Sequence, residues 1–444
     1  MSVTFSQVMS NKPLRLFQVV TFIICAVVLI ADGMDAQMLG IVAPLIIEDF
    51  GIDRGTFGLA LSAALVGFGL GSWGGGWLGD TIGRRWSLAI AAVIFSLGTI
   101  AVSTSADVWQ MAFWRLVSGL GFGSAYANAI TLAGEWLPER WRSVGVTTLS
   151  VGTPAGGMVV GFMAPGLVES YGWTGSFVFL GILTLLVVIL IIAFLRDSPT
   201  FLMARGKVEE AKKAALRVTD EENELIEETH SPDADGGTIG VLHRSNKRLN
   251  IGVGLAFTAA TMVAYGILGW TTTILTAKGF EFDQASYAVA VAGMTSIFSS
   301  IAAGLIVQRW GSKLAMTWFS STLFVTLLLL TIMLESLAGA PSDGERILVV
   351  ILIGTAAALF SASIASMYAI MTHAYPPSCR SAGIGFGIFM GRFGAIGSSA
   401  FGGTLLDIGA GSTVPFFAVM CIGAALISSA AFVIDRPVPP LAKT

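Results

Sequence analysis

The stretch GWLGDTIGRR, residues 76–85, recurs in degenerate form as GLIVQRWGSK, residues 304–313. Both copies keep glycine at the first and eighth positions and a basic residue at the tenth. A second pattern, PxxxRSxG, begins at Pro138 and again at Pro376. Two short motifs that recur in the same order indicate that the chain consists of two homologous halves.

Each motif lies between long apolar runs. A helix that crosses a membrane needs about 20 mostly apolar residues. The sequence holds twelve such runs, six on each side of a polar stretch. They span residues 16–46, 56–79, 86–105, 109–131, 143–168, 174–195, 249–275, 284–307, 314–334, 346–371, 382–406 and 412–434.

The composition agrees with a membrane protein. The 444 residues are 54% hydrophobic and 12% charged, whereas soluble domains carry about 25% charged residues. We therefore predict an all-α membrane protein with an N-terminal six-helix half (1–195), a central loop (196–248) and a C-terminal six-helix half (249–444). In the central loop, residues 207–228 are predicted to form a surface helix and residues 230–237 a loop.

Lys and Arg are distributed unevenly between the loops. The loops on one side of the predicted bundle hold only Arg54, Lys278 and Arg346, and most of the others fall on the side of the central loop and both termini. Because positive residues favour the cytoplasmic side, both termini and the central loop are expected in the cytoplasm. The first apolar run is too long for a cleavable signal, so a multi-pass protein of the cytoplasmic (inner) membrane is predicted.

With these features the chain resembles the major facilitator superfamily. Residues 76–85 are similar to the loop signature of that superfamily. Residues 197–202, DSPTFL, resemble its acidic-Ser-Pro-Arg-aromatic-Leu motif, with Thr200 in place of the usual Arg. The resemblance implies two six-helix pseudo-repeats that rock about a substrate site near the membrane midplane.

A narrower resemblance lies in the first helix. Asp32-Gly33-Met34-Asp35 resembles the DGxD motif of the aromatic acid:proton symporter family, and Arg115, Arg380 and Arg392 fit the pattern of that family. It implies proton-coupled uptake of an aromatic carboxylate. A histidine that the family carries near the loop between helices 8 and 9 has no counterpart here, so no step that depends on histidine is expected.

Charged residues inside a membrane are costly and usually functional. Asp32 and Asp35 share one face of the first helix and are the predicted proton-coupling residues. Arg392, near the midplane, is predicted to bind the carboxylate of the substrate, because a guanidinium grips a carboxylate with two hydrogen bonds. Arg115 is a second candidate for substrate binding, and the alternative is a structural ion pair with Asp35.

Polar and aromatic residues of helices 4, 7 and 10 are predicted to line the cavity that these helices form in the superfamily. The candidates for substrate contact are Asn128, Tyr265, Trp270 and Tyr368. An aromatic ring could stack on such side chains. The alternative, for Trp270 above all, is ordinary packing.

A further group of residues lies at the predicted cytoplasmic ends of the helices. We predict that they form a cytoplasmic gate of ion pairs between helices, although positive residues also belong there for topological reasons alone. The gate residues are Asp80, Gly83, Arg84, Arg85, Glu135, Arg142 and Arg380.

Together these residues predict a proton-coupled importer of a small organic anion, with an aromatic carboxylate as the expected substrate class, that is no enzyme and acts as a monomer in the lipid bilayer. The proton gradient is the only expected driving force, with no cofactor, metal or nucleic acid. No phosphate-binding loop for ATP and no Cys/His cluster occur in the sequence. An exporter remains an alternative, because GTPAGG (152–157) partly resembles a motif of drug:proton antiporters, although close helix packing is the preferred interpretation. A membrane sensor that does not transport is a second alternative.

Overall fold

The computed structural model describes residues 2–3, 5, 9, 13–219, 224–225, 240–337, 339–376 and 379–440. Within them, 11 helical segments are long and apolar enough to cross a membrane. One of these, Thr148–Phe194, has 47 residues, about twice the length that a crossing needs. Its backbone is broken at Gly172, where φ is 67° and ψ is 179°. This segment therefore holds two spans, and the described residues contain the twelve predicted spans.

The helices fall into two sets on either side of the central loop. The first set consists of α2 (Leu16–Ile41), the short α3 (Ala43–Phe50), α4 (Arg54–Ile82), α5 (Arg84–Val102), α6 (Val108–Trp136), α7 (Glu139–Ser150) and α8 (Gly152–Phe194). The second set consists of α11 (Lys247–Ala277), α12 (Phe282–Trp310), α13 (Ser312–Ser336), α14 (Asp343–Ala374), α15 (Arg380–Ile408) and α16 (Val414–Val433).

The segment between the sets holds α9 (Pro199–Ala204), α10 (Val208–Ala215), β2 (Glu224–Leu225) and the 3-10 helix η1 (Arg244–Asn246). β2 pairs in parallel with β1 (Ser2–Val3). The surface helix predicted for residues 207–228 is wrong in its extent, because α10 ends at Ala215, a turn follows at residues 216–218 and Glu224–Leu225 forms β2. The branched side chain of Val218 disfavours helix in that turn. Residues 220–223 and 226–228 lie outside the described residues. The loop predicted at 230–237 lies outside the described residues.

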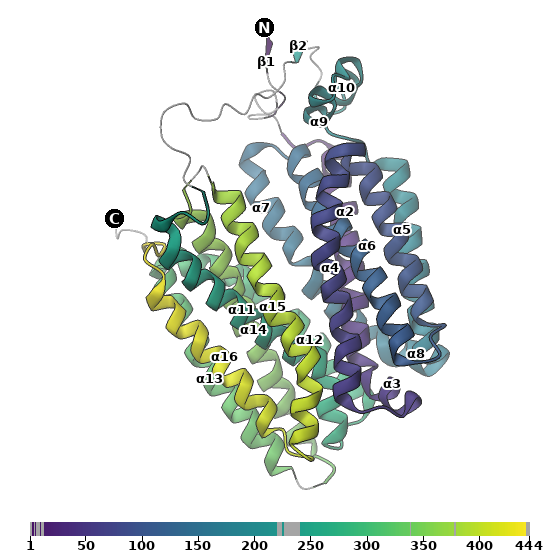
Figure 1. Cartoon of the computed structure of the whole chain (residues 1–444), viewed down its shortest axis with the longest axis vertical. Coiled ribbons are helices and arrows are strands. Elements are labelled where there is room, and N and C mark those ends of the chain that lie inside the picture. Colours follow the sequence, from purple (N-terminus) through teal and green to yellow (C-terminus); the bar gives the residue numbers. More distant parts are fainter. Residues whose placement is uncertain are drawn as a thin grey trace.

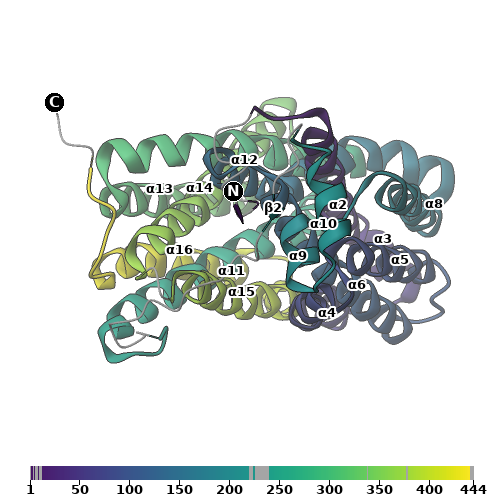
Figure 2. The same cartoon turned by 90° about the horizontal axis from the view of Figure 1, so that it is seen from above.

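The two sets of helices form two bundles that stand side by side (Figures 1 and 2). Helices α9 and α10 cap one end of the molecule, and the N-terminal strand β1 lies beside them. We call this the loop end, and the other the opposite end. Seen from the loop end in Figure 2, purple and blue helices of the first half occupy one side and green and yellow helices of the second half the other.

The repeated loop motif adopts the same backbone in both halves. Gly83 separates α4 from α5 with φ 102° and ψ 150°, and Gly311 separates α12 from α13 with φ 81° and ψ 155°. A positive φ is strained for residues with a Cβ atom. The glycine at the eighth position of the motif is therefore required by the turn, which explains why both copies keep it.

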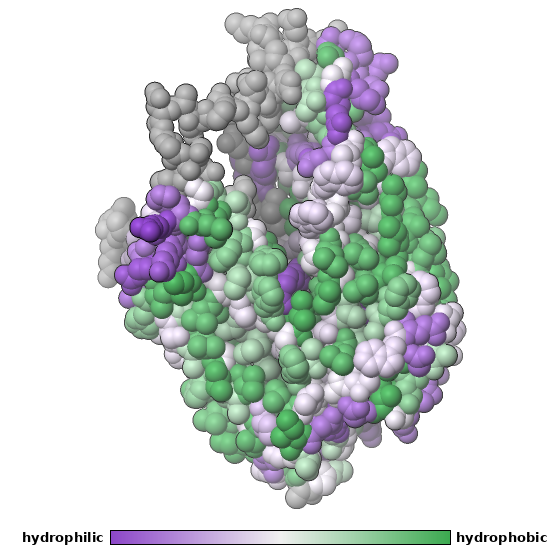
Figure 3. Space-filling view, in the orientation of Figure 1, coloured by the Kyte–Doolittle hydropathy of each residue, from purple (hydrophilic) through white to green (hydrophobic). Residues whose placement is uncertain are grey.

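The halves approach each other most closely toward the opposite end. A Cβ atom on Gly58 of α4 would lie 2.5 Å from the carbonyl oxygen of Ala400 in α15, and Gly403 of α15 packs against the carbonyl oxygen of Arg54. Close by, the backbone N–H of Gly55 donates a hydrogen bond of 3.1 Å to the Asp407 carboxylate. At the loop end, by contrast, the surface is hollowed between the two halves (Figure 3).

Small residues also bring α8 close to its neighbours. Gly156 packs against the backbone of Ile30 in α2, and Gly33 of α2 packs against the backbone of Thr153. On the other side, a Cβ atom on Gly293 of α12 would lie 2.7 Å from the carbonyl oxygen of Pro154. The packing interpretation of the GTPAGG stretch is thus confirmed, with α8 held between α2 of its own half and α12 of the other.

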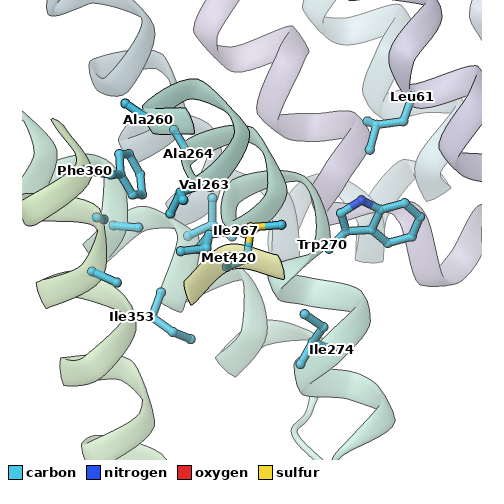
Figure 4. Packing of buried hydrophobic residues seen from close by; sticks show 14 of the residues in the cluster. Leu61, Ala260, Val263, Ala264, Ile267, Trp270, Ile274, Ile353, Phe360 and Met420 are labelled. Atoms are coloured by element: carbon cyan, nitrogen blue, oxygen red, sulfur yellow. The ribbon is translucent and has the colours of Figure 1, made fainter. Parts of the chain in front are cut away.

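Apolar side chains fill the second bundle. Figure 4 shows Val263 and Ile267 of α11 packed with Met420 of α16, with Ile353 of α14 below them. Trp270 lies further along α11, beside Leu61 of the first half. The apolar core therefore continues from the second half into the seam between the halves.

We expect Gly58→Val to separate the halves at the opposite end, because the new side chain has no room beside Ala400. The reporter is a cysteine introduced at Leu61, which is 7% exposed, in a background that lacks the three native cysteines. Its reaction with a soluble maleimide should become severalfold faster.

Gly69→Val in the same helix is the matched control, since no described atom lies within 4 Å of the place that a Cβ atom would take there. It should leave the rate unchanged. Equal rates in the two variants would show that the Gly58 contact does not hold the seam.

Candidate functional site

Asp35 of α2 and Arg115 of α6 form a buried ion pair. The Arg115 Nη1 atom lies 2.8 Å from Asp35 Oδ2, and Arg115 and Asp35 are 1% and 4% exposed. The Thr99 hydroxyl donates a hydrogen bond of 3.0 Å to the other carboxylate oxygen, and the guanidinium also lies over the Phe177 ring. Both charges are thereby compensated inside the first half. Arg115 therefore forms the ion pair with Asp35, and its role in substrate binding stays a prediction.

Asp32 lies about one turn away on the same helix and has fewer partners. The Thr153 hydroxyl is 3.4 Å from its Oδ2 atom, which is long for an O–H donor. The glycine at position 33 lets the backbone of Thr153 approach α2 and so places this hydroxyl. Asp32 is 7% exposed and lies within electrostatic reach of Asp35, Arg392 and Arg115.

Arg392 projects from the middle of α15 toward the other half. Its guanidinium carbon lies 3.6 Å from the centre of the Phe68 ring in α4. No hydrogen bond or ion pair joins Arg392 to any described residue. A permanently charged group at the centre of the bundle is therefore held by the face of an aromatic ring rather than by a carboxylate.

Three half-buried tyrosines from three helices lie around this arginine. Tyr126 of α6 is within electrostatic reach of Tyr368, Arg392, Tyr265 and Asp32. Tyr368 packs edge-on against Phe257, with ring centres 5.4 Å apart. In the part of the chain that the structure describes, none of the three hydroxyls has a hydrogen-bond partner. Together with Asp32 and Arg392 they form what we call the central group: Asp32, Tyr126, Tyr265, Tyr368 and Arg392.

Two residues of this region, Phe68 and Tyr126, were not predicted from the sequence. Phe68 is apolar and carries no signal of function in an apolar helix. Tyr126 is one tyrosine in the apolar helix α6, and the one signal that it offers is its place between Arg115 and the loop end. Both belong to an aromatic cluster of the first half, in which the ring of Phe68 lies 5.5 Å from that of Tyr126 and 4.9 Å from that of Phe122.

Two predicted contact residues lie away from the central group. The Asn128 amide donates hydrogen bonds of 2.9 Å to the Gly75 carbonyl and the Ser87 hydroxyl, so it links α6 to α4 and α5. Trp270 is fully buried in the seam, with its ring centre 6.0 Å from that of Phe57. Its indole N–H has no partner among the described atoms. Both residues therefore have packing environments in this structure.

The predicted gate residues of the first half form one network at the loop end. Arg84 lies 2.6 Å from Asp80 and 3.4 Å from Glu135, and Glu135 accepts a hydrogen bond of 2.6 Å from the Ser198 hydroxyl. This network ties α4, α5 and α6 to the start of α9.

The segment just before α9 also holds the turn at Gly83. The Asp197 carboxylate accepts a hydrogen bond of 2.9 Å from the Arg85 backbone N–H and lies against Gly83, where a Cβ atom would be 2.7 Å from its oxygens. Burial raises the pKa of Asp197, and that hydrogen bond together with the charges of Arg85 and Arg84 opposes the rise. Gly83 and Asp197 thus form one packed corner.

The two remaining gate candidates are placed differently. Arg142 of α7 donates a hydrogen bond of 2.9 Å to the Gly134 carbonyl, and Arg380 is exposed at the start of α15 in the other half. The contacts of the network stay within the first half and its adjoining α9. Of the predicted ion pairs between helices, the structure has those of Arg84 with Asp80 and with Glu135, and these two do not close the space between the halves.

Comparison with known proteins agrees with this architecture. Residues 25–365 match the model of the Major Facilitator Superfamily. The 4-hydroxybenzoate transporter PcaK of Pseudomonas aeruginosa is 28% identical over 404 residues, which cover 90% of this chain and 88% of that protein. The gallate transporter of Pseudomonas putida is also 28% identical, with 91% and 89% covered.

Solved structures give the same fold. The xylose transporter XylE of E. coli, in a partially occluded inward open conformation, superposes with a TM-score of 0.72 at 16% identity, over 97% of this chain and 100% of that one. Among the described residues no cluster of His, Cys, Asp and Glu could hold a metal ion. With a family model that covers most of its length, a matching fold and relatives that transport aromatic acids, the chain belongs to the Major Facilitator Superfamily of membrane transporters.

Proposed function

We propose that this transporter imports a small aromatic carboxylate together with protons across the cytoplasmic membrane. The observation that carries the proposal is Arg392, a positive charge between the two halves whose contact partner among the described residues is an aromatic ring. A guanidinium in this position favours an anionic ligand. The similar relatives that carry 4-hydroxybenzoate and gallate support an aromatic acid.

The central group supplies the other functions that such a ligand needs. Tyr126, Tyr265 and Tyr368 offer aromatic faces for a ring and hydroxyls without partners in the described part of the chain. Arg392 would bind the carboxylate with two parallel hydrogen bonds. A ligand held in this way would contact helices of both halves, and alternating access requires that kind of link.

Within the Asp32/Asp35 pair predicted to couple protons, we assign the titrating role to Asp32. Asp35 is fixed by Arg115 and Thr99, and its protonation would leave Arg115 charged and unpaired in the bundle. Asp32 has one long hydrogen bond and lies near Arg392. It can therefore exchange a proton without breaking the buried ion pair.

The topology is part of the proposal. The loop end carries most of the Lys and Arg residues, so we place it, with both termini, in the cytoplasm. The hollow at this end (Figure 3) and the packed seam at the opposite end would then make this an inward-facing conformation. We expect a monomer, because each chain holds one complete central group.

Transport by proteoliposomes tests the function directly. Purified protein should accumulate labelled 4-hydroxybenzoate when the outside is more acidic than the inside, and it should lose accumulation when the gradient is collapsed. Accumulation driven by the opposite gradient would favour the exporter, and binding without any flux would favour the sensor.

Asp32→Asn should abolish accumulation driven by the pH gradient, because the amide cannot take up and release a proton. Exchange of labelled for unlabelled substrate should survive, since exchange requires no net proton release. Thr153→Val, which removes only the hydroxyl beside Asp32, is the control and should keep accumulation. Full accumulation by the asparagine variant would remove Asp32 from proton coupling.

Arg392→Ala should weaken binding of the aromatic anion by about ten- to a hundredfold, the loss expected for charge-assisted hydrogen bonds worth roughly 1.5–3 kcal/mol. Arg392→Lys keeps the charge but not the planar fork, so it should also bind weakly. The measurement is equilibrium binding to the purified, folded variants. Unchanged affinity in both would exclude Arg392 from the carboxylate site.

Asp80→Asn should slow transport while leaving the equilibrium affinity within a few-fold, because the network at Arg84 lies at the loop end and away from the central group. The second copy of the motif provides the control: Gln308→Asn alters the equivalent, exposed position in the other half and should have little effect. A large loss of affinity with normal turnover would contradict a role in switching.

A further inference from the structure

The contact between Phe68 and Arg392 joins α4 of the first half to α15 of the second. The guanidinium carbon lies 3.6 Å from the ring centre, well inside the distance of about 6 Å at which a cation is attracted to an aromatic face. Phe68 is 6% exposed, and the rings of Phe122 and Tyr126 pack against it. The ring is thus fixed by its own half and covered by the arginine of the other.

In the empty carrier the charge of Arg392 lacks the carboxylate that compensates it in the loaded carrier. When the substrate anion is bound, its carboxylate compensates the charge of Arg392. When the anion has left, the charge of Arg392 must be accommodated in another way while the halves move past each other. Asp32 can balance the charge at longer range, but no ion pair joins it to Arg392 among the described residues.

We propose that Phe68 is the resting partner of Arg392: it holds the guanidinium in the empty carrier and gives it up to the carboxylate of the arriving substrate. Phe68 is then a positioning residue for the return of the unloaded protein. The inference rests on the proposed function for the identity of the anion. The contact itself crosses between α4 and α15, so its role in the empty protein can be measured without any substrate.

The first test is a double-mutant cycle on the purified, ligand-free protein. Phe68→Leu, Arg392→Met and the double variant are compared by thermal unfolding. If the ring holds the arginine, the double variant should melt at a higher temperature than the sum of the two single-variant decreases in melting temperature predicts.

Phe95→Leu is the matched control for this cycle, because Phe95 is a buried ring of the same aromatic cluster that contacts Phe122 rather than Phe68. The decrease in melting temperature caused by Phe95→Leu should add to the decrease caused by Arg392→Met. If the decreases in melting temperature for Phe68→Leu and Arg392→Met are also additive, the proposal is overturned, whatever the substrate is.

The second test separates the empty step from the loaded steps, with labelled 4-hydroxybenzoate as the probe. Net uptake requires the empty carrier to return, whereas exchange does not. Phe68→Leu should lower net uptake by roughly five- to tenfold and leave exchange within about twofold. Phe68→Tyr, which keeps an aromatic face, should restore net uptake.

The outcomes distinguish the two proposals. If the wild-type protein transports no aromatic acid, the proposed function fails, and the unfolding cycle still decides the role of Phe68. Equal losses of uptake and exchange in Phe68→Leu, or no loss of either, would overturn the resting-partner role while leaving the proposed function intact.

Discussion

A charge in the middle of a bilayer must be compensated, and the structure satisfies this requirement in two different ways. The Asp35–Arg115 pair is complete, with a hydroxyl and an aromatic ring adding to the ion pair. Breaking such a pair leaves an uncompensated buried charge and is strongly destabilising. Asp32 and Arg392 are only partly satisfied, and partly satisfied groups can change partners during a cycle. The Asp35–Arg115 pair therefore stabilises the half in which it lies, whereas Asp32 and Arg392 each keep the capacity to take a new partner, as the proposed function requires.

The halves differ at their loop ends, although they share the turn at Gly83 and Gly311. In the first half, Asp80, Arg84 and Glu135 surround the turn with ion pairs. In the second half, Gln308 and Ser312 stand in place of Asp80 and Arg84, and Ser312 instead exchanges hydrogen bonds with the backbone of Val438 after α16. Nearby, Arg436 binds Asn246 and the carbonyls of Ala374 and Ser245. The repeat thus preserves the backbone, while among the described residues the charged network belongs to the first half.

The helices and their pairing into halves could be predicted from the sequence because apolar runs and glycine turns are local signals. The buried charges could also be found, since an aspartate or arginine in an apolar helix is conspicuous. The partners of those residues could not be predicted, because they depend on how far each helix is rotated about its axis. Asn128 and Trp270 share helices with Arg115 and Tyr265, yet they face α4, α5 and the seam rather than the central group. The sequence offers no chemical signal at Phe68, and only its position opposite Arg392 points to a functional role.

Part of the seam at the opposite end consists of glycine against backbone, as at Gly58 with Ala400 and Gly403 with Arg54, beside buried side chains such as Trp270. Ordering a long side chain costs up to about 2 kcal/mol in rotamer entropy, and a glycine has no rotamers to lose. The glycine part of the seam can form and separate without freezing and releasing side chains at each turn of the cycle. Its two surfaces are also hard, because main-chain atoms cannot move aside as a flexible side chain does. Opening at this end should therefore be an all-or-none rigid-body event, and leakage through a partly opened seam should be rare.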